Sequence, residues 1–394
     1  MERKGWSTGG KKRIKPGYAE RYVASPQTGT GSLTPLFGRL CSATVQGRQG
    51  SLRSWWRNGK SRILLLLLSG ILPAILPLPG QASETEGLPT LADISRDPSD
   101  LPGPLPRRAP TQVRIDLQAR EIDRRLTDGA TFRYWTFDGK VPGPFLRVRV
   151  GDTVEVHLRN DPESRMVHSV DLHAAWGYSG GATLTQAVPG AEKIFTFRAL
   201  NPGLYLYHCG TPVISQHIAN GMYGLILVEP PGGLPKADRE FYFMQGEIYT
   251  SGSFGSSGSL VSDLSKILQA QPDYFVFNGA VGSLLRHPLR ARVGQKVRIF
   301  FGNAGPNFSS NLHALGAIFE RIYEDGSVAT PPMENSCSIF VPAGGAGFVE
   351  FAPKVPGTYP LVDHFFSRQE KGLGGELLVT GPLDPSIIHE GKAR

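Results

Sequence analysis

Residues 148–158 read VRVGDTVEVHL, and from Thr153 to Leu158 the apolar residues alternate with polar ones. This period of two is typical of a strand with one buried face, because successive strand side chains point to opposite sides. Short runs of the same kind, broken by glycine and proline, continue along the chain from Gln112 onward. The pattern therefore predicts an all-β protein built as a sandwich or barrel.

Part of this stretch belongs to an internal repeat. Three segments return later in the chain in the same order: VRVGDTV (148–154) as ARVGQKV (291–297), NPGLY (201–205) as VPGTY (355–359), and GMYGLILV (221–228) as GLGGELLV (372–379). A repeated order of this kind predicts that the same β-fold occurs twice. We therefore expect two tandem domains, at residues 111–230 and 231–382.

The charge of the chain is unevenly distributed. The 394 residues carry a formal net charge of +8, which by itself would favour an anionic partner such as nucleic acid. Residues 1–62 contain thirteen Lys and Arg and two acidic residues, a net of +11, and residues 63–82 carry no charge. The remainder therefore nets −3, and we expect no nucleic-acid partner.

The basic leader ends in a pattern typical of an export signal. Four basic residues between 53 and 62 precede an apolar run from Ile63 to Leu78, and Gly80-Gln81-Ala82 offers a small-residue cleavage site. A transmembrane anchor is the alternative, but two prolines interrupt the run and it is short for a bilayer. We expect a periplasmic protein with these segments: an N-terminal extension and signal peptide (1–82), a proline-rich arm (83–110), the two domains, and a C-terminal tail (383–394).

Two kinds of metal ligand stand side by side in Tyr207-His208-Cys209, within a segment that reads as a strand. Neighbours in a strand point to opposite faces, so His208 and Cys209 can bind metal only at two different sites. His168 and His173 of an earlier strand also point to opposite faces, because they are an odd number of positions apart. The sequence therefore predicts an inner and an outer metal centre joined by one peptide unit.

The inner set consists of His168, Cys209, His217 and Met222. Two imidazoles, a thiolate and a weak axial methionine are the ligands of a type 1 copper centre, which suits one-electron transfer. Zinc is the alternative metal, but its usual protein ligands do not include methionine. A set of ordinary core residues is the other alternative, and it would make all four matches a coincidence.

The chain contains three cysteines, of which Cys41 would be removed with the leader. An exported protein with two remaining cysteines can form a disulfide. We instead expect Cys209 to be a ligand. Because Cys337 stands beside the strand-like segment Ser338–Val341, we expect it to be a buried free thiol.

The outer set consists of His173, His208 and a third histidine, for which His364 is the best candidate. Three neutral imidazoles with an open fourth position form a catalytic metal centre that binds a small ligand. Either the second domain folds back or a neighbouring subunit supplies His364. Asp171 shares a face with His173 and is placed to pass protons, a turn or cap role being the alternative. His313 is a fourth ligand, a second proton donor or a relic of duplication.

These residues closely resemble the copper-containing nitrite reductases, over roughly Val113 to Gly381. The match rests on HSVDLH (168–173), YHC (207–209), HIANGM (217–222), His313 and VDH (362–364). The resemblance implies two tandem cupredoxin-like Greek-key domains and a homotrimer. It also implies one type 1 and one type 2 copper per subunit, the type 1 copper held by His168, Cys209, His217 and Met222 and the type 2 copper by His173 and His208 of one subunit and His364 of the next.

The reaction implied by the resemblance is the one-electron reduction of nitrite to nitric oxide and water. The electron enters at type 1 copper and passes through Cys209 and His208 to type 2 copper, while Asp171 and His313 supply protons. No Cys-x-x-Cys-His haem motif is present in the chain, so the expected donor is a separate cytochrome c or cupredoxin.

Four positions depart from the usual pattern of the family. Ser169 stands where Asn is common, Gly210 where Ala is common, Trp176 where a small polar residue is expected, and Leu315 where Ile usually covers the substrate pocket. None of them removes a ligand or a proton donor. We expect Leu315 to shape the substrate pocket.

Two other functions remain as alternatives. A two-domain multicopper oxidase needs paired His-x-His motifs and a His-Cys-His strand, and this chain has neither. A non-enzymatic electron-transfer cupredoxin would explain the inner set alone. It would leave the remaining residues without a role, namely Asp171, His173, His208, His313 and His364.

Overall fold

The protein is an all-β structure over residues 92–391, which the computed structural model describes. Twenty strands and six short helices lie in that range, which confirms the predicted fold class. No helix among these residues is long and apolar enough to cross a membrane. The predicted signal peptide and its cleavage near Ala82 lie outside the described residues.

Strands from residues 112–229 build two sheets, and one later strand is added at the edge of the first sheet. The first sheet has five strands in the order β10 (Gly258–Leu260), β2 (Ala130–Phe137), β1 (Gln112–Thr127), β4 (Thr153–Asn160) and β6 (Glu192–Arg198). The second has the order β3 (Leu146–Arg149), β8 (Tyr223–Glu229), β7 (Gly203–His208) and β5 (Asp171–Leu172). Buried side chains of both sheets share one core, including Leu117, Val156, Val148 and Ile226.

Strands from residues 239–380 build a second pair of sheets. The six-stranded sheet has the order β11 (Tyr274–Phe277), β9 (Arg239–Ile248), β13 (Val297–Asn303), β18 (Gly345–Phe351), β15 (Phe319–Tyr323) and β16 (Met333–Ser336). The five-stranded sheet has the order β12 (His287–Arg292), β20 (Gly375–Thr380), β19 (Gly357–Asp363), β14 (Ser310–Ala314) and β17 (Ser338–Val341). Their common core includes Phe243, Ile299, Leu312 and Leu361.

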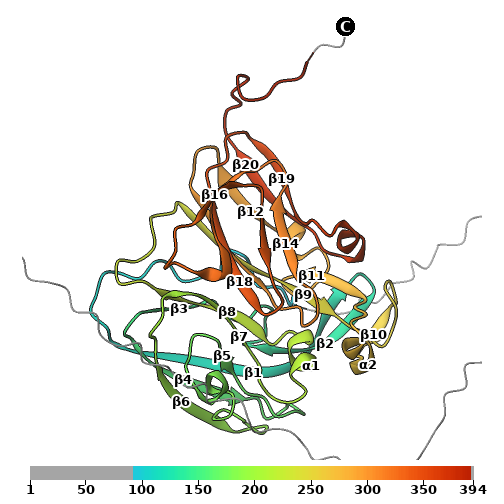
Figure 1. Cartoon of the computed structure of the whole chain (residues 1–394). Coiled ribbons are helices and arrows are strands. Elements are labelled where there is room, and N and C mark those ends of the chain that lie inside the picture. Colours follow the sequence, from blue (N-terminus) through green and yellow to red (C-terminus); the bar gives the residue numbers. More distant parts are fainter. Residues whose placement is uncertain (1–91, 392–394) are drawn as a thin grey trace, which may run out of the picture. The chain divides into compact units, whose positions relative to one another are not determined.

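The helices are connections between strands. They are η1 (Tyr178–Gly181), α1 (Ile214–Ala219), α2 (Leu264–Leu268), α3 (Ser283–Arg286), η2 (Glu324–Gly326) and η3 (Phe366–Lys371). Figure 1 shows the first pair of sheets mainly in cyan to green and the second pair in yellow to red.

The repeated sequence corresponds to a repeated pattern of strand pairing. β3 pairs in parallel with β8, and β12 pairs in parallel with β20. β4 has a parallel partner in β1 and an antiparallel partner in β6, and β13 has the equivalent partners in β9 and β18. Within β4, Val154 and Val156 are buried while Glu155 is exposed, as the alternation predicts. The chain therefore contains the same β-architecture twice, while the residue bounds of the two domains stay predictions.

A shared apolar core and a chain of buried charges connect the two pairs of sheets. The core contains Leu225 of β8 beside Tyr242 and Phe300 of β9 and β13. Arg147 of β3 contacts Glu240 of β9 at 2.8 Å, and Glu240 contacts Arg298 of β13 at 2.6 Å. Both arginine side chains are 1% exposed, so their charges depend on carboxylates for compensation, and each has a second one, Glu229 beside Arg147 and Glu350 beside Arg298.

Candidate metal centres

Three buried ligand side chains meet in the core of the first pair of sheets. His217 Nδ1 lies 3.2 Å from Cys209 Sγ and 3.2 Å from His168 Nδ1. All three donor atoms lie within 4.8 Å of one another. Two imidazole nitrogens and one sulfur in a dry setting form the donor set of a soft transition-metal site.

The loop between β7 and β8 brings three of the predicted inner residues together. Cys209 directly follows β7, His217 lies in α1, and Met222 directly precedes β8. The amide of Cys209 donates to the Met222 carbonyl at 3.1 Å, and the amide of Met222 donates to the His217 carbonyl at 3.2 Å. Met222 is fully buried in the same core cluster as Cys209. The loop thus folds back on itself and gathers three of the four residues of the predicted inner set.

The sulfur of Cys209 has neighbours that favour a thiolate. Burial alone would raise the pKa of the Cys209 thiol, but the neighbouring imidazoles of His168 and His217 hold this pKa well below its usual range. The amide of Ser169 also donates to the sulfur, at 3.3 Å. A thiolate is the form of cysteine that binds metal.

The outer residues Asp171, His173 and His208 form a second group, whose donor atoms also lie within 4.8 Å of one another. The two Nε2 atoms of His173 and His208 are 3.1 Å apart, and Asp171 Oδ2 lies 3.9 Å from His208 Nε2. His208 Nδ1 donates to the carbonyl of Cys209 at 2.9 Å, which leaves its Nε2 lone pair facing His173. His208 and Cys209 lie in different groups, as the alternation of side chains along a strand predicts, and their binding of metal stays a prediction.

The backbone around Asp171 explains how a carboxylate is held beside this group. Asp171 is the first residue of β5 and pairs with His208 of β7. Gly180 of η1 packs against it with a φ of 59°, and a Cβ atom there would lie only 2.7 Å from the Leu172 carbonyl oxygen. A left-handed glycine is therefore required for η1 to cover the carboxylate.

His313 and His364 belong to neither group within residues 92–391 of one chain. They form a pair of their own, with ring centroids 5.1 Å apart, at the ends of β14 and β19. His313 is buried and its Nδ1 donates to the carbonyl of Cys337, whereas His364 is exposed. Leu315 is half-buried two residues beyond His313, and its amide donates to Pro360. Within the described residues, one chain therefore holds the predicted outer residues as two separate groups, the two partial sites, and not as one group.

The prediction that Cys337 is a buried thiol was wrong. Cys337 is exposed and occupies a bend between β16 and β17. The bend places its side chain outside the alternating register of both strands, so the apolar segment that follows does not bury it. Its carbonyl, rather than its sulfur, makes the contact with His313.

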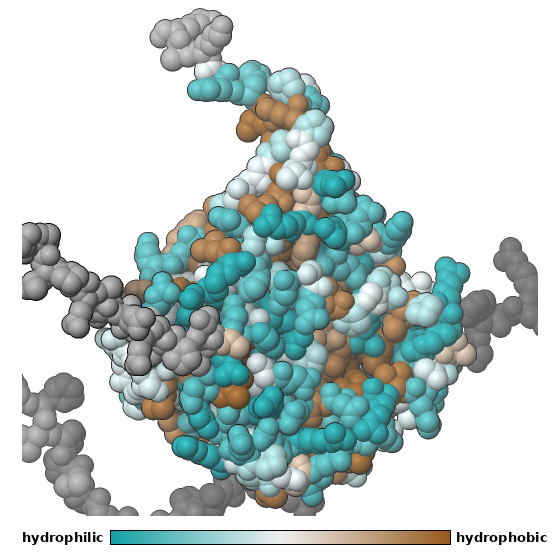
Figure 2. Space-filling view, turned by 180° about the vertical axis from the view of Figure 1, so that it is seen from behind, coloured by the Kyte–Doolittle hydropathy of each residue, from teal (hydrophilic) through white to brown (hydrophobic). Residues whose placement is uncertain are grey.

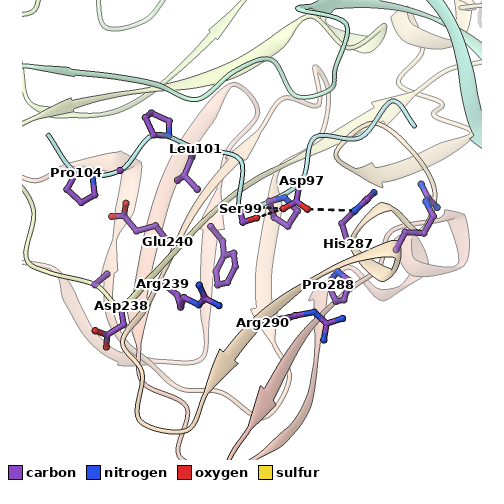
Figure 3. A pocket seen from close by; sticks show the side chains of 16 residues that line it. Asp97, Ser99, Leu101, Pro104, Asp238, Arg239, Glu240, His287, Pro288 and Arg290 are labelled. Carbon is purple, nitrogen blue, oxygen red and sulfur yellow. Dashed lines mark hydrogen bonds and ion pairs between the residues drawn. The ribbon is translucent and has the colours of Figure 1, made fainter. Parts of the chain in front are cut away.

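One cavity of about 550 Å³ lies away from both groups. It is bordered by the arm before β1 and by residues of β9 and β12, and Figure 3 shows Asp97, His287 and Arg290 around it. No predicted site residue lines it. Asp97 is already engaged by Ser99 and His287.

The sequence reasoning missed Glu121, which contacts the inner group. Its side chain is 2% exposed, and its Oε1 lies 3.3 Å from His168 Nε2. A signal was present in β1, where Ile115, Leu117 and Ala119 are buried at every second position. Glu121 is the next residue on that face. Because burial of a charge is costly unless the charge is paired, a carboxylate at a core-facing strand position indicates a partner for it in the core.

Comparisons with known proteins identify relatives of this chain. A family model described as multicopper oxidase matches residues 118–233. The copper-containing nitrite reductase of Neisseria gonorrhoeae is 46% identical over 303 residues, which are 76% of this chain and 77% of that protein. The one of Alcaligenes xylosoxydans xylosoxydans is 34% identical over 70% of this chain and 88% of that protein.

A solved structure of the copper nitrite reductase from Nitrosomonas europaea has a TM-score of 0.61 and 38% identity to this chain. The match covers 70% of this chain and 96% of that one. The extent of these matches, together with the two ligand groups and the repeated β-architecture, leads to one conclusion. The chain belongs to the family of copper-containing nitrite reductases.

Proposed function

We propose that this protein reduces nitrite to nitric oxide and water with copper as its cofactor. The observation that carries the proposal is the adjacency of His208 and Cys209, which belong to two different ligand groups. In the proposed assignment, His168, Cys209, His217 and Met222 hold type 1 copper, and His173 and His208 with His364 of a neighbouring subunit hold type 2 copper. Bound copper supplies one-electron chemistry and polarises the bound substrate.

The donor atoms of both groups fit this cofactor. The inner group offers a thiolate sulfur and two imidazole nitrogens in a site from which solvent is excluded, with all three residues 0% or 1% exposed. The outer group offers two imidazole nitrogens that face one another, one of them held in that tautomer by the Cys209 carbonyl. Soft and borderline ligands of these kinds suit copper in its two oxidation states.

Cys209 and His208 supply the proposed route for the electron between the two groups. The covalent route runs from the Cys209 side chain through one peptide unit to the His208 side chain. A hydrogen bond of 2.9 Å from His208 Nδ1 to the Cys209 carbonyl gives a second, shorter connection. Both connections are short and buried, which favours rapid transfer of one electron.

Asp171 and His313 are assigned to proton delivery. One nitrite ion, one electron and two protons give one nitric oxide and one water, so two protons must reach a nitrite oxygen. Asp171 lies 3.9 Å from His208 Nε2, beside the position where a substrate would bind. His313 is paired with His364 on the other partial site. A subunit that delivers its His364 to this position therefore delivers its His313 as well.

A homotrimer is the proposed assembly, with each type 2 site completed across a subunit interface. Exposed aromatic side chains flank both partial sites: Trp176 and Tyr178, 76% and 72% exposed, follow His173, and Phe365 and Phe366, 47% and 48% exposed, follow His364. Figure 2 shows hydrophobic residues in separate patches among hydrophilic ones on one face. Exposed aromatic groups beside a partial site are features of an interaction surface.

Export to the periplasm belongs to the proposal as well, on the basis of the basic and apolar leader. The electron donor is then a separate cytochrome c or cupredoxin in the same compartment, since the chain carries no haem motif. The inner group is the proposed point of entry for its electron.

Copper analysis with electron paramagnetic resonance tests the function. The purified protein should contain two coppers per subunit with distinct type 1 and type 2 signals, and nitrite should perturb the type 2 signal alone. A single type 1 signal that nitrite leaves unchanged would contradict the proposal and favour an electron-transfer cupredoxin. If the protein consumes oxygen rather than nitrite with an artificial electron donor, the result would favour a multicopper oxidase. The family model that matches residues 118–233 has that description.

A further inference from the structure

We infer that Glu121 is a positioning residue of the inner metal centre, which fixes the orientation and tautomer of His168 and lowers the reduction potential of the bound metal. The inference rests on the proposed function, because it takes the inner group to be a type 1 copper site. Nothing in the ligand pattern of the sequence points to this residue.

Three donors converge on one oxygen atom of Glu121. The backbone amides of Arg165 and Met166 each donate to Oε1 at 2.8 Å. His168 Nε2 lies 3.3 Å from the same atom. The carboxylate therefore holds both the backbone segment that leads to His168 and the imidazole itself.

This contact determines which nitrogen of His168 faces the metal position. A carboxylate accepts hydrogen bonds, so Nε2 of His168 carries the proton. Nδ1 is then the unprotonated nitrogen, and it faces His217 Nδ1 at 3.2 Å. Carboxylate–histidine–metal arrangements of this kind set the tautomer and increase the donor strength of the imidazole.

The two histidines of the inner group are supported unequally. Among the described residues, His217 Nε2 is buried without a hydrogen-bond partner, whereas His168 Nε2 has Glu121. Trp135, which pairs with Glu121 across β1 and β2, packs edge-on against both imidazole rings, with centroids 5.6 Å from His168 and 4.6 Å from His217. Trp135 thus restrains both rings by packing, and Glu121 adds negative charge to one of them.

The electronic consequence follows from the buried negative charge. A carboxylate bonded to one ligand stabilises the cupric state more than the cuprous state, because the cupric ion carries the larger positive charge. Glutamine at this position keeps an oxygen that accepts the two backbone amides but removes the charge. Glu121→Gln therefore separates the electronic role from the structural one.

The test is the reduction potential of the type 1 centre in copper-loaded protein. In Glu121→Gln we expect the preference for cupric over cuprous copper to fall about tenfold, which for a one-electron couple raises the potential by about 59 mV. The control is Asp116→Asn, which removes an exposed carboxylate from the opposite face of the same strand. The control should leave the potential unchanged.

The outcomes separate this inference from the function on which it rests. An unchanged potential in Glu121→Gln, with wild-type type 1 absorption present, overturns the role of Glu121 and leaves the function standing. Wild-type protein loaded with copper that shows no type 1 absorption contradicts the function and the inference together.

A second measurement covers the case in which Glu121→Gln does not fold. In the cuprous wild-type protein, nuclear magnetic resonance should detect an Nε2 proton of His168 that exchanges slowly with solvent. Rapid exchange of that proton, or its attachment to Nδ1, overturns the inference without any variant.

Discussion

His208 Nδ1 donates a 2.9 Å hydrogen bond to the carbonyl oxygen of Cys209, its own neighbour in the chain. The bond ties together two residues whose side chains serve different ligand groups. It fixes the tautomer of His208, so that Nε2 faces His173, and it shortens the connection to the sulfur of Cys209. One backbone carbonyl therefore contributes both to the geometry of the outer group and to its link with the inner group.

Asp171→Asn should lower the turnover of nitrite by a factor of about 10² to 10⁴, the usual contribution of a positioned proton donor. Asparagine has a similar shape but cannot deliver a proton. Steady-state assays should show this loss while copper content and both resonance signals remain. Asp128→Asn, at a side chain that is 95% exposed, is the matched control. An unchanged rate in Asp171→Asn would remove this residue from the proton path.

Complementation between two inactive variants tests the interface site. His173→Ala and His364→Ala should each lose type 2 copper, since each removes one ligand. When the two chains are unfolded and refolded together, mixed trimers should regain part of the activity, because one chain still provides His173 and the other His364. The separately refolded variants serve as controls. Failure of the refolded mixture, under conditions in which wild-type protein recovers, would argue that each site is completed within one chain.

Leu315→Ile should change the turnover number without changing copper content. Leu315 is half-buried two residues after His313, and the exchange moves one methyl group while the volume stays the same. Steady-state kinetics with copper quantitation would check this. Loss of type 2 copper in the variant would show that Leu315 supports the metal site rather than the substrate pocket.

Glu247 should make stability depend on pH. Burial raises the pKa of its carboxyl from the ordinary 4.5 to about 7. The pKa of Glu247 is higher in the folded than in the unfolded protein. Its contribution to the unfolding free energy is therefore complete below pH 4.5 and is lost as the pH rises through 7. The unfolding free energy should fall by about 3 kcal/mol over this range, by the usual conversion of pKa shifts to energy.

Denaturant unfolding at several pH values measures this effect. Glu247→Gln keeps an acceptor for the Tyr249 hydroxyl and the Phe308 amide, and it should flatten the pH profile. Glu163→Gln, at an exposed position, should keep the profile of the wild type. If the unfolding free energy of Glu247→Gln depends on pH as it does in the wild type, another titrating group causes the dependence.

Glu240→Gln should destabilise the protein by about 3 kcal/mol, because it removes one negative charge from a buried cluster in which Arg147 keeps only Glu229 and Arg298 keeps only Glu350. Glu240 lies 2.8 Å from Arg147 and 2.6 Å from Arg298. Glu320→Gln is the contrasting variant, since Glu320 and Lys354 form a surface pair with side chains 41% and 64% exposed. Its cost should stay below about 1 kcal/mol. Denaturant unfolding measures both variants, and an equal loss of unfolding free energy in the two would contradict the importance of burial.

The sequence by itself determined the β-architecture, its duplication, and the division of ligands between two faces. These features depend on the alternation of side chains along a strand, which is local geometry and can be counted from residue numbers. The odd spacing of His168 and His173 and the adjacency of His208 and Cys209 were therefore sufficient to separate two groups. The roles of these residues in binding copper stay predictions.

Only the tertiary structure decided which residues support those groups. Glu121 meets His168 because β1 and the segment before His168 come together in the folded core, and no spacing in the sequence records that approach. The bend that exposes Cys337 and turns its carbonyl toward His313 likewise depends on how two strands are joined. Contacts between distant segments follow from the packing of the whole chain, so they emerge only when the fold is complete.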